Sequence, residues 1–330
     1  MEDVATRAGV SRALVSLVMR GSPKVSEHRR EAVLRAADEL GYSPHAMARS
    51  LASRTSHFLG VMVSDLHNAF WAEIVDGLDA CARAEGFELV INTGGRRATR
   101  ERQALASLLS FRPAGIALLG PVVPAPAIAS AAEQSPLVLV SRSSRLSTVD
   151  TVNDDGQSGS ALAVDHLVSL GHTDIVHIDG GGGSQASPRR TGYISAMSRH
   201  RLAPHVIRSE YTDVAGAKAI RELLDTHDYK NLPTAIVAAN DFNAIGAISA
   251  LEEAGLHVPS DVSVVGYDNT SLAALRHVSL TTVDQPRIEM GRLAAEALLQ
   301  RVRGERAGPV RHLLRPALVV RSTTGPPLRN

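Results

Sequence analysis

The chain has 330 residues, of which 44% are hydrophobic and 21% are charged, the balance of a folded globular protein with two or three domains. Its formal net charge of +1 is divided unevenly, because residues 1–56 contain nine Lys and Arg against six Asp and Glu, while the remaining 274 residues contain 26 against 28. The single Cys81 excludes a disulfide framework and a thiolate metal cluster, and the lack of a signal peptide or an apolar run of membrane-spanning length predicts a cytoplasmic protein.

Residues 1–43 have the apolar spacing of short helices joined by a tight turn. A first helix would bury Val4, Ala5 and Ala8, which share one helical face, and Gly9 permits the left-handed backbone of the turn. Such a helix-turn-helix can place its second helix in the major groove of DNA. The positive charge at this end of the chain agrees with an attraction to phosphate.

The second helix would begin after Ser11, which is a good N-cap. Leu14, Val15 and Val18 have the spacing to pack on the first helix, so the opposite side is free for DNA. The residues that we expect to contact DNA at the start and on the outer side of this helix are Ser11, Arg12, Ala13, Ser16 and Leu17.

A third helix would start after Ser26 and end near Gly41. Its inward face would consist of Val33, Ala36, Ala37 and Leu40. A generic three-helix bundle has the same spacing, so this pattern alone leaves that alternative open. The segment that follows begins with Pro44 and has little apolar surface, and about ten residues are too few for a helix that is stable alone. We therefore expect a linker that becomes ordered only with a partner.

From Phe58 onward, apolar strands alternate with helices, which predicts an α/β fold with parallel sheets. The expected strands are residues 59–63, 87–91, 115–119, 136–140, 174–178, 206–209, 235–239 and 262–266. The expected helices are residues 74–82, 102–111, 161–170, 190–199, 215–224, 242–254 and 287–303. These units are too many for one small sheet, so we predict two similar lobes with a small-molecule site between them, at the carboxyl ends of the strands.

The run from Asp3 to Asp65 resembles the LacI/GalR family of bacterial transcriptional regulators, and later motifs extend the resemblance over nearly the whole chain. The resemblance rests on the helix-turn-helix spacing, on Ala48-Arg49-Ser50-Leu51 and on Leu59-Gly60-Val61-Met62-Val63. It implies a DNA-binding headpiece, a hinge helix that folds on operator DNA, and a two-lobed effector domain that resembles periplasmic sugar-binding proteins.

The expected domain boundaries follow from this resemblance. The headpiece would be residues 1–43, the hinge residues 44–56, and the effector-binding and dimerisation domain residues 57–330. Within that domain the lobes would be about 57–155 with 285–314, and about 156–284 with 315–330.

The resemblance adds three residues to the expected DNA contacts: Arg20 near the end of the second helix, and Arg49 and Leu51 in the hinge. It places Leu51 in the minor groove as an apolar wedge. Leu17 and Arg20 depart from the Arg and Asn that are common in the family at these positions, so the operator sequence cannot be transferred from relatives.

Two aromatic residues, Phe70 and Trp71, follow the strand that ends at Val63. The resemblance places them at the effector cleft, where they would stack on a sugar or a purine-like ring, but core packing is an equal alternative. Arg189 matches the family motif Arg-x-x-Gly-aromatic, in which the Arg contacts the effector. The adjacent Arg190 leaves the assignment open, and a surface position is the alternative.

Polar residues also follow two later strands. Asn240 and Asp241 follow residues 235–239, and Asp268 follows Tyr267. The resemblance places all three at the cleft, where Asp268 would pair with the Arg. Asp241 can instead cap the next helix. Tyr211 matches an aromatic wall position in the family, although that correspondence is weaker.

The sequence therefore predicts a homodimeric transcriptional repressor that binds a near-palindromic operator and responds to a small effector, a sugar or related metabolite. The alternative is a sugar-binding receptor of a transport system, which the missing signal peptide and the basic N-terminal region disfavour. We expect no enzyme and no metal or other cofactor. Gly180–Gly183 lacks the G-x-G-x-x-G spacing, and the 13 His lack the H-E-x-x-H spacing of zinc sites.

Overall fold

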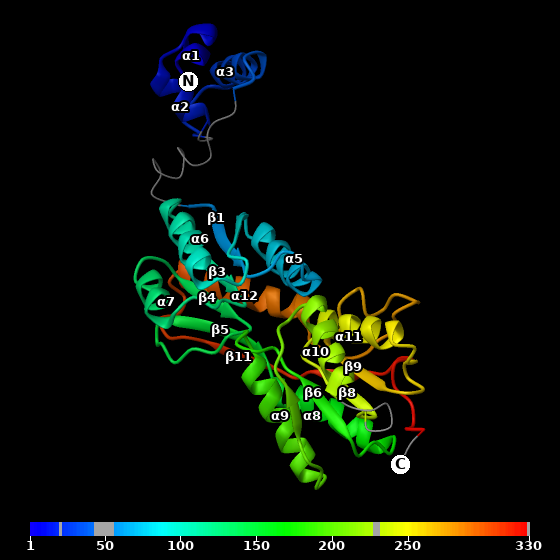
Figure 1. Ribbon diagram of the computed structural model, residues 1–330. Helices are drawn as coiled ribbons and strands as arrows, with labels where there is room; N and C mark the ends of the chain where they lie inside the picture. Colours follow the sequence, from blue (N-terminus) through cyan, green and yellow to red (C-terminus); the bar gives the residue numbers. More distant parts are fainter. Residues whose placement is uncertain (20–21, 43–55, 227–231, 329–330) are drawn as a thin grey trace. The chain divides into compact units, whose positions relative to one another are not determined.

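The structure, a computed structural model, describes residues 1–19, 22–42, 56–226 and 232–328. The chain divides into two compact units, Met1–Ser56 and His57–Asn330 (Figure 1). The expected contacts Arg20, Arg49 and Leu51 lie outside the described residues.

The first unit contains helices α1 (Glu2–Ala8), α2 (Arg12–Met19) and α3 (Glu27–Glu39). Gly9 ends α1 with a φ of 64°, which is the predicted left-handed turn. The Ser11 hydroxyl accepts a hydrogen bond from the Leu14 amide at 3.2 Å, as expected of an N-cap. The shared core of the three helices consists of Val4, Ala5, Val15, Val18, Val25, Val33, Ala36 and Ala37.

Two predictions for this unit are wrong in detail. Leu40 is 47% exposed, because α3 ends at Glu39 and the chain turns away at Gly41, where φ is 59°. Leu17 is partly buried and packs against the core, so this side chain is not freely available on the outer side of α2.

In the second unit, the first six-stranded sheet has the order β11-β5-β4-β3-β1-β2, and its neighbouring strands are parallel. Its strands are β1 (Phe58–Val63), β2 (Glu88–Thr93), β3 (Gly115–Leu119), β4 (Leu137–Val140), β5 (Val149–Asp154) and β11 (Arg311–Leu314). Helices α5 (Ala69–Ala84) and α12 (Arg287–Val302) cover one face, and α6 (Ala98–Ser110) and α7 (Ala125–Ala132) cover the other. We call this sheet and its helices the N-lobe.

The second six-stranded sheet has the order β12-β10-β9-β8-β6-β7, and β12 is antiparallel to β10. Its strands are β6 (Ile175–Ile178), β7 (His205–Ile207), β8 (Ala235–Ala238), β9 (Ser263–Asp268), β10 (Thr281–Asp284) and β12 (Ala317–Val319). Helices α8 (Gly156–Ser169) and α9 (Ala186–Arg199) cover one face, and α10 (Asp213–Thr226) and α11 (Asp241–Glu253) cover the other. We call this sheet and its helices the C-lobe.

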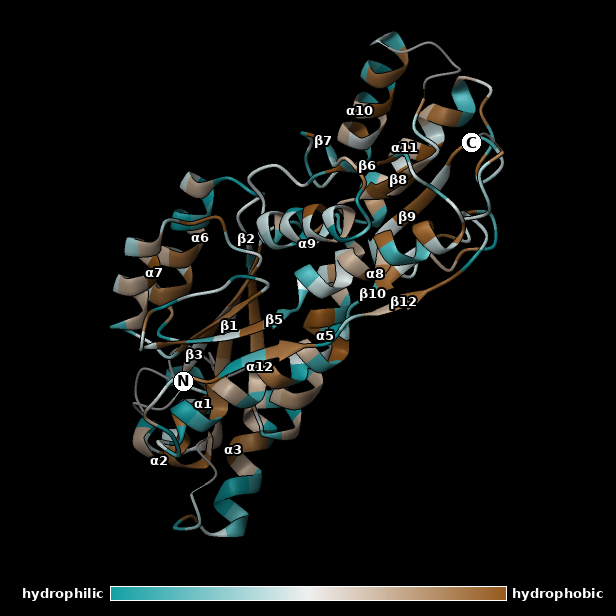
Figure 2. Cartoon of the chain, turned by 90° about the horizontal axis from the view of Figure 1, so that it is seen from below, coloured by the Kyte–Doolittle hydropathy of each residue, from teal (hydrophilic) through white to brown (hydrophobic). Residues whose placement is uncertain are grey.

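The central strands of both sheets are buried on both faces, which explains their continuous apolar runs; Figure 2 shows these strands as hydrophobic. Along β1, Leu59, Val61 and Val63 face the core under α5 and α12, while Met62 faces the core under α6 and α7. The predicted α/β class, with a helical N-terminal unit and two parallel-sheet lobes, is confirmed.

The chain passes between the lobes at three places in the described residues: from β5 to α8, from β10 to α12 and from β11 to β12. At the first two crossings, the polar side chains of Asp155 and Gln285 are partly buried and buried. The Tyr267 hydroxyl of the C-lobe donates to the Asp154 carboxylate of the N-lobe at 2.5 Å. Near the second crossing, Arg287 donates to Glu73 at 2.7 Å and to Asp284 at 3.1 Å. These contacts tie the two lobes together at the crossings.

The sequence reading missed α7 and strands β5, β10, β11 and β12. Strand β5 reads Val-Asp-Thr-Val-Asn-Asp and is entirely buried, so it lacks the apolar run that marked the other strands. Its Asp150 is buried because Arg301 and Arg306 donate to its carboxylate at 2.8 Å and 2.9 Å. Partners distant in sequence make such a strand possible, and local spacing does not reveal them.

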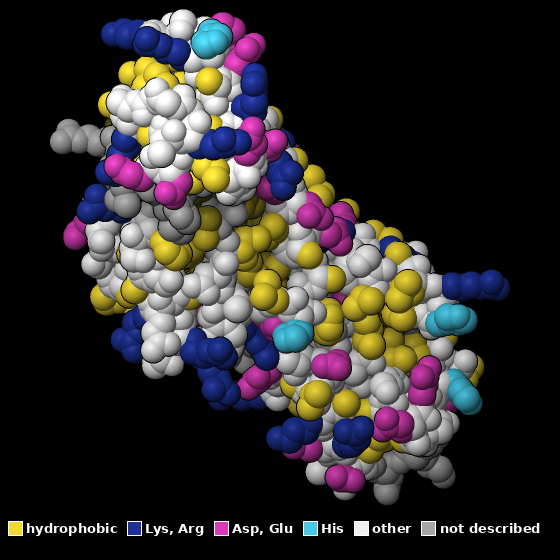
Figure 3. All heavy atoms as spheres, turned by 90° about the horizontal axis from the view of Figure 1, so that it is seen from above, with side chains coloured by type: hydrophobic (Ala, Val, Ile, Leu, Met, Phe, Trp, Pro, Cys, Tyr) yellow, Lys and Arg dark blue, Asp and Glu magenta, His cyan; other side chains and the backbone are white. Residues whose placement is uncertain are grey.

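No helix among the described residues is long and apolar enough to cross a membrane. On the face that Figure 3 shows, acidic and basic side chains are interspersed, with hydrophobic side chains between them.

Candidate functional site

A cavity of about 680 Å³ lies between the two lobes, where the carboxyl ends of their central strands face each other. The N-lobe contributes residues that follow β1, β2, β3 and β4, and the C-lobe contributes residues that follow β6, β7 and β8 and the last residue of β9. Six of the seven predicted effector residues line it: Phe70, Trp71, Arg189, Tyr211, Asn240 and Asp268.

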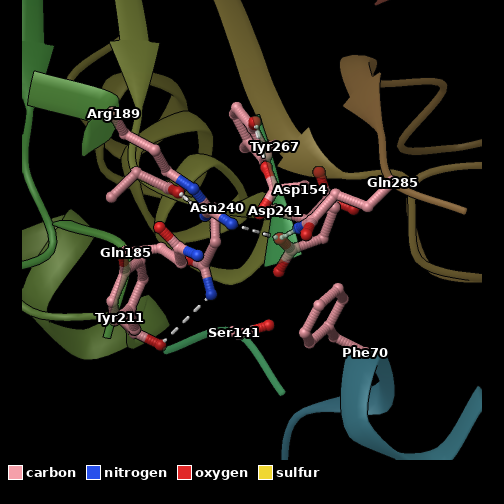
Figure 4. A network of polar contacts seen from close by, with 12 residues as sticks. Phe70, Ser141, Asp154, Gln185, Arg189, Tyr211, Asn240, Asp241, Tyr267 and Gln285 are labelled. Atoms are coloured by element: carbon pink, nitrogen blue, oxygen red, sulfur yellow. Dashed lines mark hydrogen bonds and ion pairs between the residues drawn. The ribbon is translucent and has the colours of Figure 1, made fainter. Parts of the chain in front are cut away.

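Arg189 is the central cation of the cavity (Figure 4). It lies in the first turn of α9 and is 4% exposed. One terminal nitrogen donates to the Ala239 carbonyl at 2.6 Å, and the other donates to the Asp268 carboxylate at 3.4 Å. Its guanidinium carbon lies 3.7 Å from the centre of the Tyr267 ring, a cation–π contact.

The neighbouring Arg190 points elsewhere, because its guanidinium donates to the Asp179 carboxylate at 2.7 Å. The structure therefore settles which of the two arginines lines the cavity.

Asp268 is held in place by the second crossing between the lobes. Its carboxylate accepts a hydrogen bond from the Gln285 amide at 2.6 Å, and its carbonyl accepts one from Arg287. Its φ of 112° is unusual for a residue with a side chain, which is consistent with a strongly constrained position. Desolvation raises the pKa of Asp268, with a further contribution from Asp241, and these effects outweigh the attraction of Arg189. Sequence reasoning missed Gln285 and Arg287.

Phe70 and Trp71 belong to the N-lobe core and also line the cavity. Both are buried in the N-lobe core, at 3% and 9% exposure, and both line the cavity. Their rings meet edge to face with centroids 4.7 Å apart. A Cβ at Gly120 would lie 2.4 Å from the Trp71 ring, so the loop after β3 must carry a glycine here. The two sequence interpretations of this pair are therefore compatible.

Tyr211 forms a wall of the cavity and explains the glycine-rich run after β6. A Cβ at Gly180 or Gly183 would lie 2.4 Å or 2.5 Å from its ring, so only glycine permits this close contact. The Tyr211 hydroxyl donates to the Ser184 carbonyl at 2.9 Å. The glycine run thus packs against an aromatic ring.

Asp241 does not line the cavity. Its carboxylate accepts hydrogen bonds from the Thr270 amide and hydroxyl at 2.7 Å and 2.9 Å, and from the Thr282 hydroxyl at 2.6 Å. It is fully buried and joins α11 to the ends of β9 and β10. The carboxylate of Asp241 is therefore used in a structural contact within the C-lobe, in place of the predicted ligand contact.

Asn240 lines the cavity and also caps α11, because its side-chain oxygen accepts from the Asn243 amide at 2.8 Å. The cap belongs to Asn240 rather than to Asp241, which is the first residue of the helix.

Several other residues that line the cavity were not predicted from the sequence. The charged ones are Asp65, Arg96, Arg97 and Glu210, and the polar ones with buried or partly buried side chains include Ser141, Ser184 and Gln185. Arg96 pairs with Asp65 at 3.4 Å. They lie in loops that follow strands, and their position after a strand is the only signal that the sequence offered.

In the first unit, Ser11, Arg12 and Ala13 are exposed at the start of α2, and Ser16 is partly buried. Arg12 lies 3.7 Å from the Glu2 carboxylate, and both side chains are more than half exposed. The predicted DNA-contacting end of α2 is therefore accessible within its own unit.

Comparisons with known proteins agree with this architecture. Residues 1–45 match the profile of the bacterial regulatory proteins of the lacI family, and residues 164–324 match a periplasmic binding protein-like domain. The chain is 34% identical to the ribose operon repressor of Haemophilus influenzae, covering 98% of both chains. It is 32% identical to the transcriptional repressor CytR of Escherichia coli, covering 98% of this chain and 96% of that one. The structure resembles the lac repressor dimer bound to operator and an anti-inducer, with a TM-score of 0.83, 31% identity and 98% coverage of both chains.

Proposed function

Because the chain belongs to the LacI family of bacterial transcriptional regulators, we propose that it is a homodimeric repressor whose operator affinity is set by a neutral, polyhydroxylated effector in the cavity between the lobes. The relatives with full-length similarity are regulators of transcription, and a DNA-binding repressor is supported over a transport receptor. A cytoplasmic location belongs to the same proposal, because the operator is there.

The observation that carries the effector proposal is the buried Arg189–Asp268 pair beside aromatic walls. Arg189 presents a planar set of donors, and the Asp268 carboxyl can accept or, when protonated, donate a hydrogen bond. Sugar hydroxyls both donate and accept, so they match this pair. Phe70 and Tyr211 supply the apolar surfaces on which a sugar ring or a base can stack.

The charges that line the cavity favour a neutral ligand. Apart from the Arg189–Asp268 pair, two basic and two acidic side chains line it: Arg96 and Arg97, and Asp65 and Glu210. Two of the arginines have a carboxylate partner within 3.4 Å. A strongly anionic effector would meet as much repulsion as attraction here.

The relatives support the same ligand class. A regulator from Enterococcus faecium, 26% identical, was solved with bound ribose, and the regulator CelR, 32% identical, was solved with cellobiose; both have a TM-score of 0.74. A cavity of about 680 Å³ is within the usual size range of small-molecule sites and can accept one or two rings.

We propose that operator binding is regulated by a change in the arrangement of the two lobes, which the three crossings join. An effector that binds one lobe arrangement better than another shifts the equilibrium toward it by that difference in affinity. We propose residues 44–56 as the hinge that reports this shift to the headpiece of residues 1–43. Leu51 and Arg49 would contact operator DNA from the hinge, as would Arg12 from α2.

Two experiments test the proposal. Thermal unfolding of the full chain is measured with D-ribose, D-xylulose, cellobiose, cytidine and adenosine, and at least one is expected to raise the melting temperature. Operator selection from random DNA, with the full chain and with a chain lacking residues 1–56, is expected to yield a near-palindrome only with the full chain. Failure of every compound would overturn the effector class, and equal DNA binding by the truncated chain would overturn the role of the headpiece.

A further inference from the structure

Glu101 is a buried acidic residue that takes part in neither the proposed effector contacts nor the lobe crossings. It lies in the first turn of α6 and is fully buried. Its Oε2 accepts hydrogen bonds from the backbone amides of Val122 at 2.7 Å and Val123 at 2.8 Å. These amides belong to residues 120–124, which follow β3 and which we call the β3 loop. A buried carboxylate is costly unless it is hydrogen-bonded, so the β3 loop compensates Glu101 and is held by it in return.

Arg142 holds the same loop by its carbonyls. One terminal nitrogen of its guanidinium donates to the Pro121 carbonyl at 3.0 Å and to the Val123 carbonyl at 2.5 Å. Glu101 therefore binds amides of the β3 loop, and Arg142 binds carbonyls of the same loop. The two opposite charges also stabilise each other, because Arg142 lowers the pKa of Glu101 and Glu101 raises the pKa of Arg142. We call these two side chains the charge clamp.

The charge clamp supports loops that line the cavity. Gly120 at the start of the β3 loop lines the cavity and packs against Trp71, because a Cβ there would lie 2.4 Å from the ring. The stem of Glu101 also supports the loop after β2. A Cβ at Gly94 would lie 2.1 Å from the Glu101 Cγ, and the next residues, 95–98, line the cavity. A change at Glu101 would therefore reach two lining loops, although Glu101 itself does not line the cavity.

The charge of Glu101 is finely balanced. Burial raises the pKa of its carboxyl above the usual value, while the two backbone amides and Arg142 oppose this effect. Hydrogen bonds to an ionised carboxylate are roughly twice as strong as those to a neutral group. Protonation of Glu101 would weaken its hold on the amides and would also remove the attraction for Arg142. Both arms of the charge clamp would then hold the β3 loop less firmly.

Arg142 is the main charged neighbour of Glu101 among the described residues. The β3 loop, β1 and α7 contain no charged residue. Arg96 of the loop after β2 pairs with Asp65 at 3.4 Å. The remaining charged side chains on the neighbouring segments are exposed: Glu88, Arg97, Arg100, Arg102 and Arg145.

We propose that Glu101 is a positioning residue, whose ionised carboxylate keeps the N-lobe wall of the cavity in the conformation that binds the effector and whose protonation relaxes that wall. The ligand in this inference rests on the proposed function, but the state of the wall can be measured without a ligand. Effector affinity is highest while Glu101 is ionised and decreases at lower pH as the carboxylate takes up a proton. By linkage, a bound effector makes this protonation harder.

Glu101→Gln mimics the protonated side chain in the full chain. The amide oxygen of Gln can still accept from the two backbone amides, while the charge is lost. Asp150→Asn is the matched control, because Asp150 is another fully buried carboxylate of the N-lobe. Its partners are Arg301, Arg306 and the Val310 amide, and none of them lines the cavity.

The first measurement is acrylamide quenching of Trp71 fluorescence, without a ligand. Trp71 is the only tryptophan of the sequence and packs against Gly120, so quenching reports how closely the β3 loop covers the ring. Quenching of the wild type is expected to increase as the pH falls from about 7.5 to about 5, the range in which a Glu with a raised pKa begins to take up its proton. Glu101→Gln should show the increased quenching already at the higher pH and change less over this range. Asp150→Asn should change as the wild type does.

The second measurement is calorimetry with a probe, whichever of D-ribose, D-xylulose, cellobiose, cytidine and adenosine stabilises the wild-type chain most. At the higher pH, Glu101→Gln is expected to bind the probe about 3- to 10-fold more weakly than the wild type does. The difference should shrink at the lower pH, where the wild type is itself becoming protonated. Because both chains contain Asp268 and the other acidic residues, their ratio at each pH isolates Glu101.

The outcomes separate this inference from the proposed function. If Glu101→Gln equals the wild type in quenching and affinity at both pH values, the inference is overturned and the proposed function stands. If it binds the probe more weakly by the same factor at both pH values, Glu101 acts by packing, and positioning by its charge is overturned. If no compound binds the wild type but quenching behaves as expected, the effector class falls and the positioning of the wall stands.

Arg142→Gln decides the question if Glu101→Gln does not fold. Arg142 is only partly buried, so its replacement is better tolerated. Without this cation the Glu101 carboxylate is protonated at higher pH, so the increase in Trp71 quenching should begin at higher pH than in the wild type. An unchanged pH dependence of quenching in Arg142→Gln overturns the inference.

Discussion

Arg287 is expected to hold the two lobes together, and Arg287→Met tests this. The guanidinium donates to Glu73 of α5 at 2.7 Å and to Asp284 at 3.1 Å, and it also donates to the carbonyls of Asp268 and Gln285. Its side chain is only 11% exposed. Met retains much of the aliphatic packing and removes these hydrogen bonds.

The expected loss in the free energy of unfolding depends on how exposed the partners of Arg287 are. The Glu73 and Asp284 side chains are 28% and 33% exposed, so both remain hydrated in the variant, and no fully buried charge is stranded. Each lost hydrogen bond then contributes about 0.5–1.5 kcal/mol, and solvent screening reduces the ionic part. We expect the free energy of unfolding to fall by about 2 kcal/mol.

Urea unfolding of the full chain measures this change. Trp71 is the only tryptophan of the sequence and lies in the N-lobe core, so its fluorescence reports unfolding of that lobe. Arg292→Met is the matched control, because Arg292 is on the same helix and its ion pairs with Glu289 and Glu296 stay within α12. The reasoning is refuted if Arg287→Met unfolds at the same urea concentration as wild type or as Arg292→Met.

Four further outcomes are expected. Asp268→Ala should bind operator but lose its effector response, because the substitution removes the buried partner of Arg189. Calorimetry should show a loss of at least about 2 kcal/mol in ligand affinity. A wild-type response of this variant would place the effector site elsewhere. Arg12→Ala should weaken operator binding by about 1–3 kcal/mol if it pairs with guanine, and an unchanged preference in binding-site selection would contradict this. Leu51→Ala should weaken operator binding and reduce the DNA bend without altering ligand affinity; early melting with normal operator binding would show a packing role instead. Desolvation lowers the pKa of His177 from 6.5 to about 4, so between these values the unfolded chain binds a proton at this residue that the folded chain does not. The contribution of His177 to stability is fully present above about pH 6.5 and should fall by about 3 kcal/mol toward pH 4. Urea titrations at several pH values should show that His177→Gln loses less stability over this range than the wild type does.

Much of the fold could be predicted from local sequence. Where a strand is buried on both faces, as β1 and β3 are, its residues must be apolar, and the run is visible without any structure. The turn at Gly9 and the cap at Ser11 likewise depend on neighbouring residues. Strand β5 could not be predicted in this way, because the partners of the buried Asp150 are two arginines and a backbone amide that lie 151 to 160 residues away in sequence.

The candidate site also has a part that could be predicted from the sequence and a part that required the structure. The motif around Arg189 and the positions of Phe70, Trp71 and Asp268 after strands could be predicted, since the carboxyl ends of parallel strands face a common cleft. The choice between Arg189 and Arg190 required the structure, because both lie in the same helical turn and only their partners, Asp268 and Asp179, distinguish them.

Sequence alone therefore determined the family, the α/β class and the region of the cavity, because these depend on periodic burial and on short motifs. Tertiary structure decided that Asp241 bonds to Thr270 and Thr282 rather than lining the cavity, and that Ser141 lines the cavity. A polar side chain after a strand can face a cavity or a neighbouring strand. Which of these it does depends on partners that only folding brings within hydrogen-bond distance.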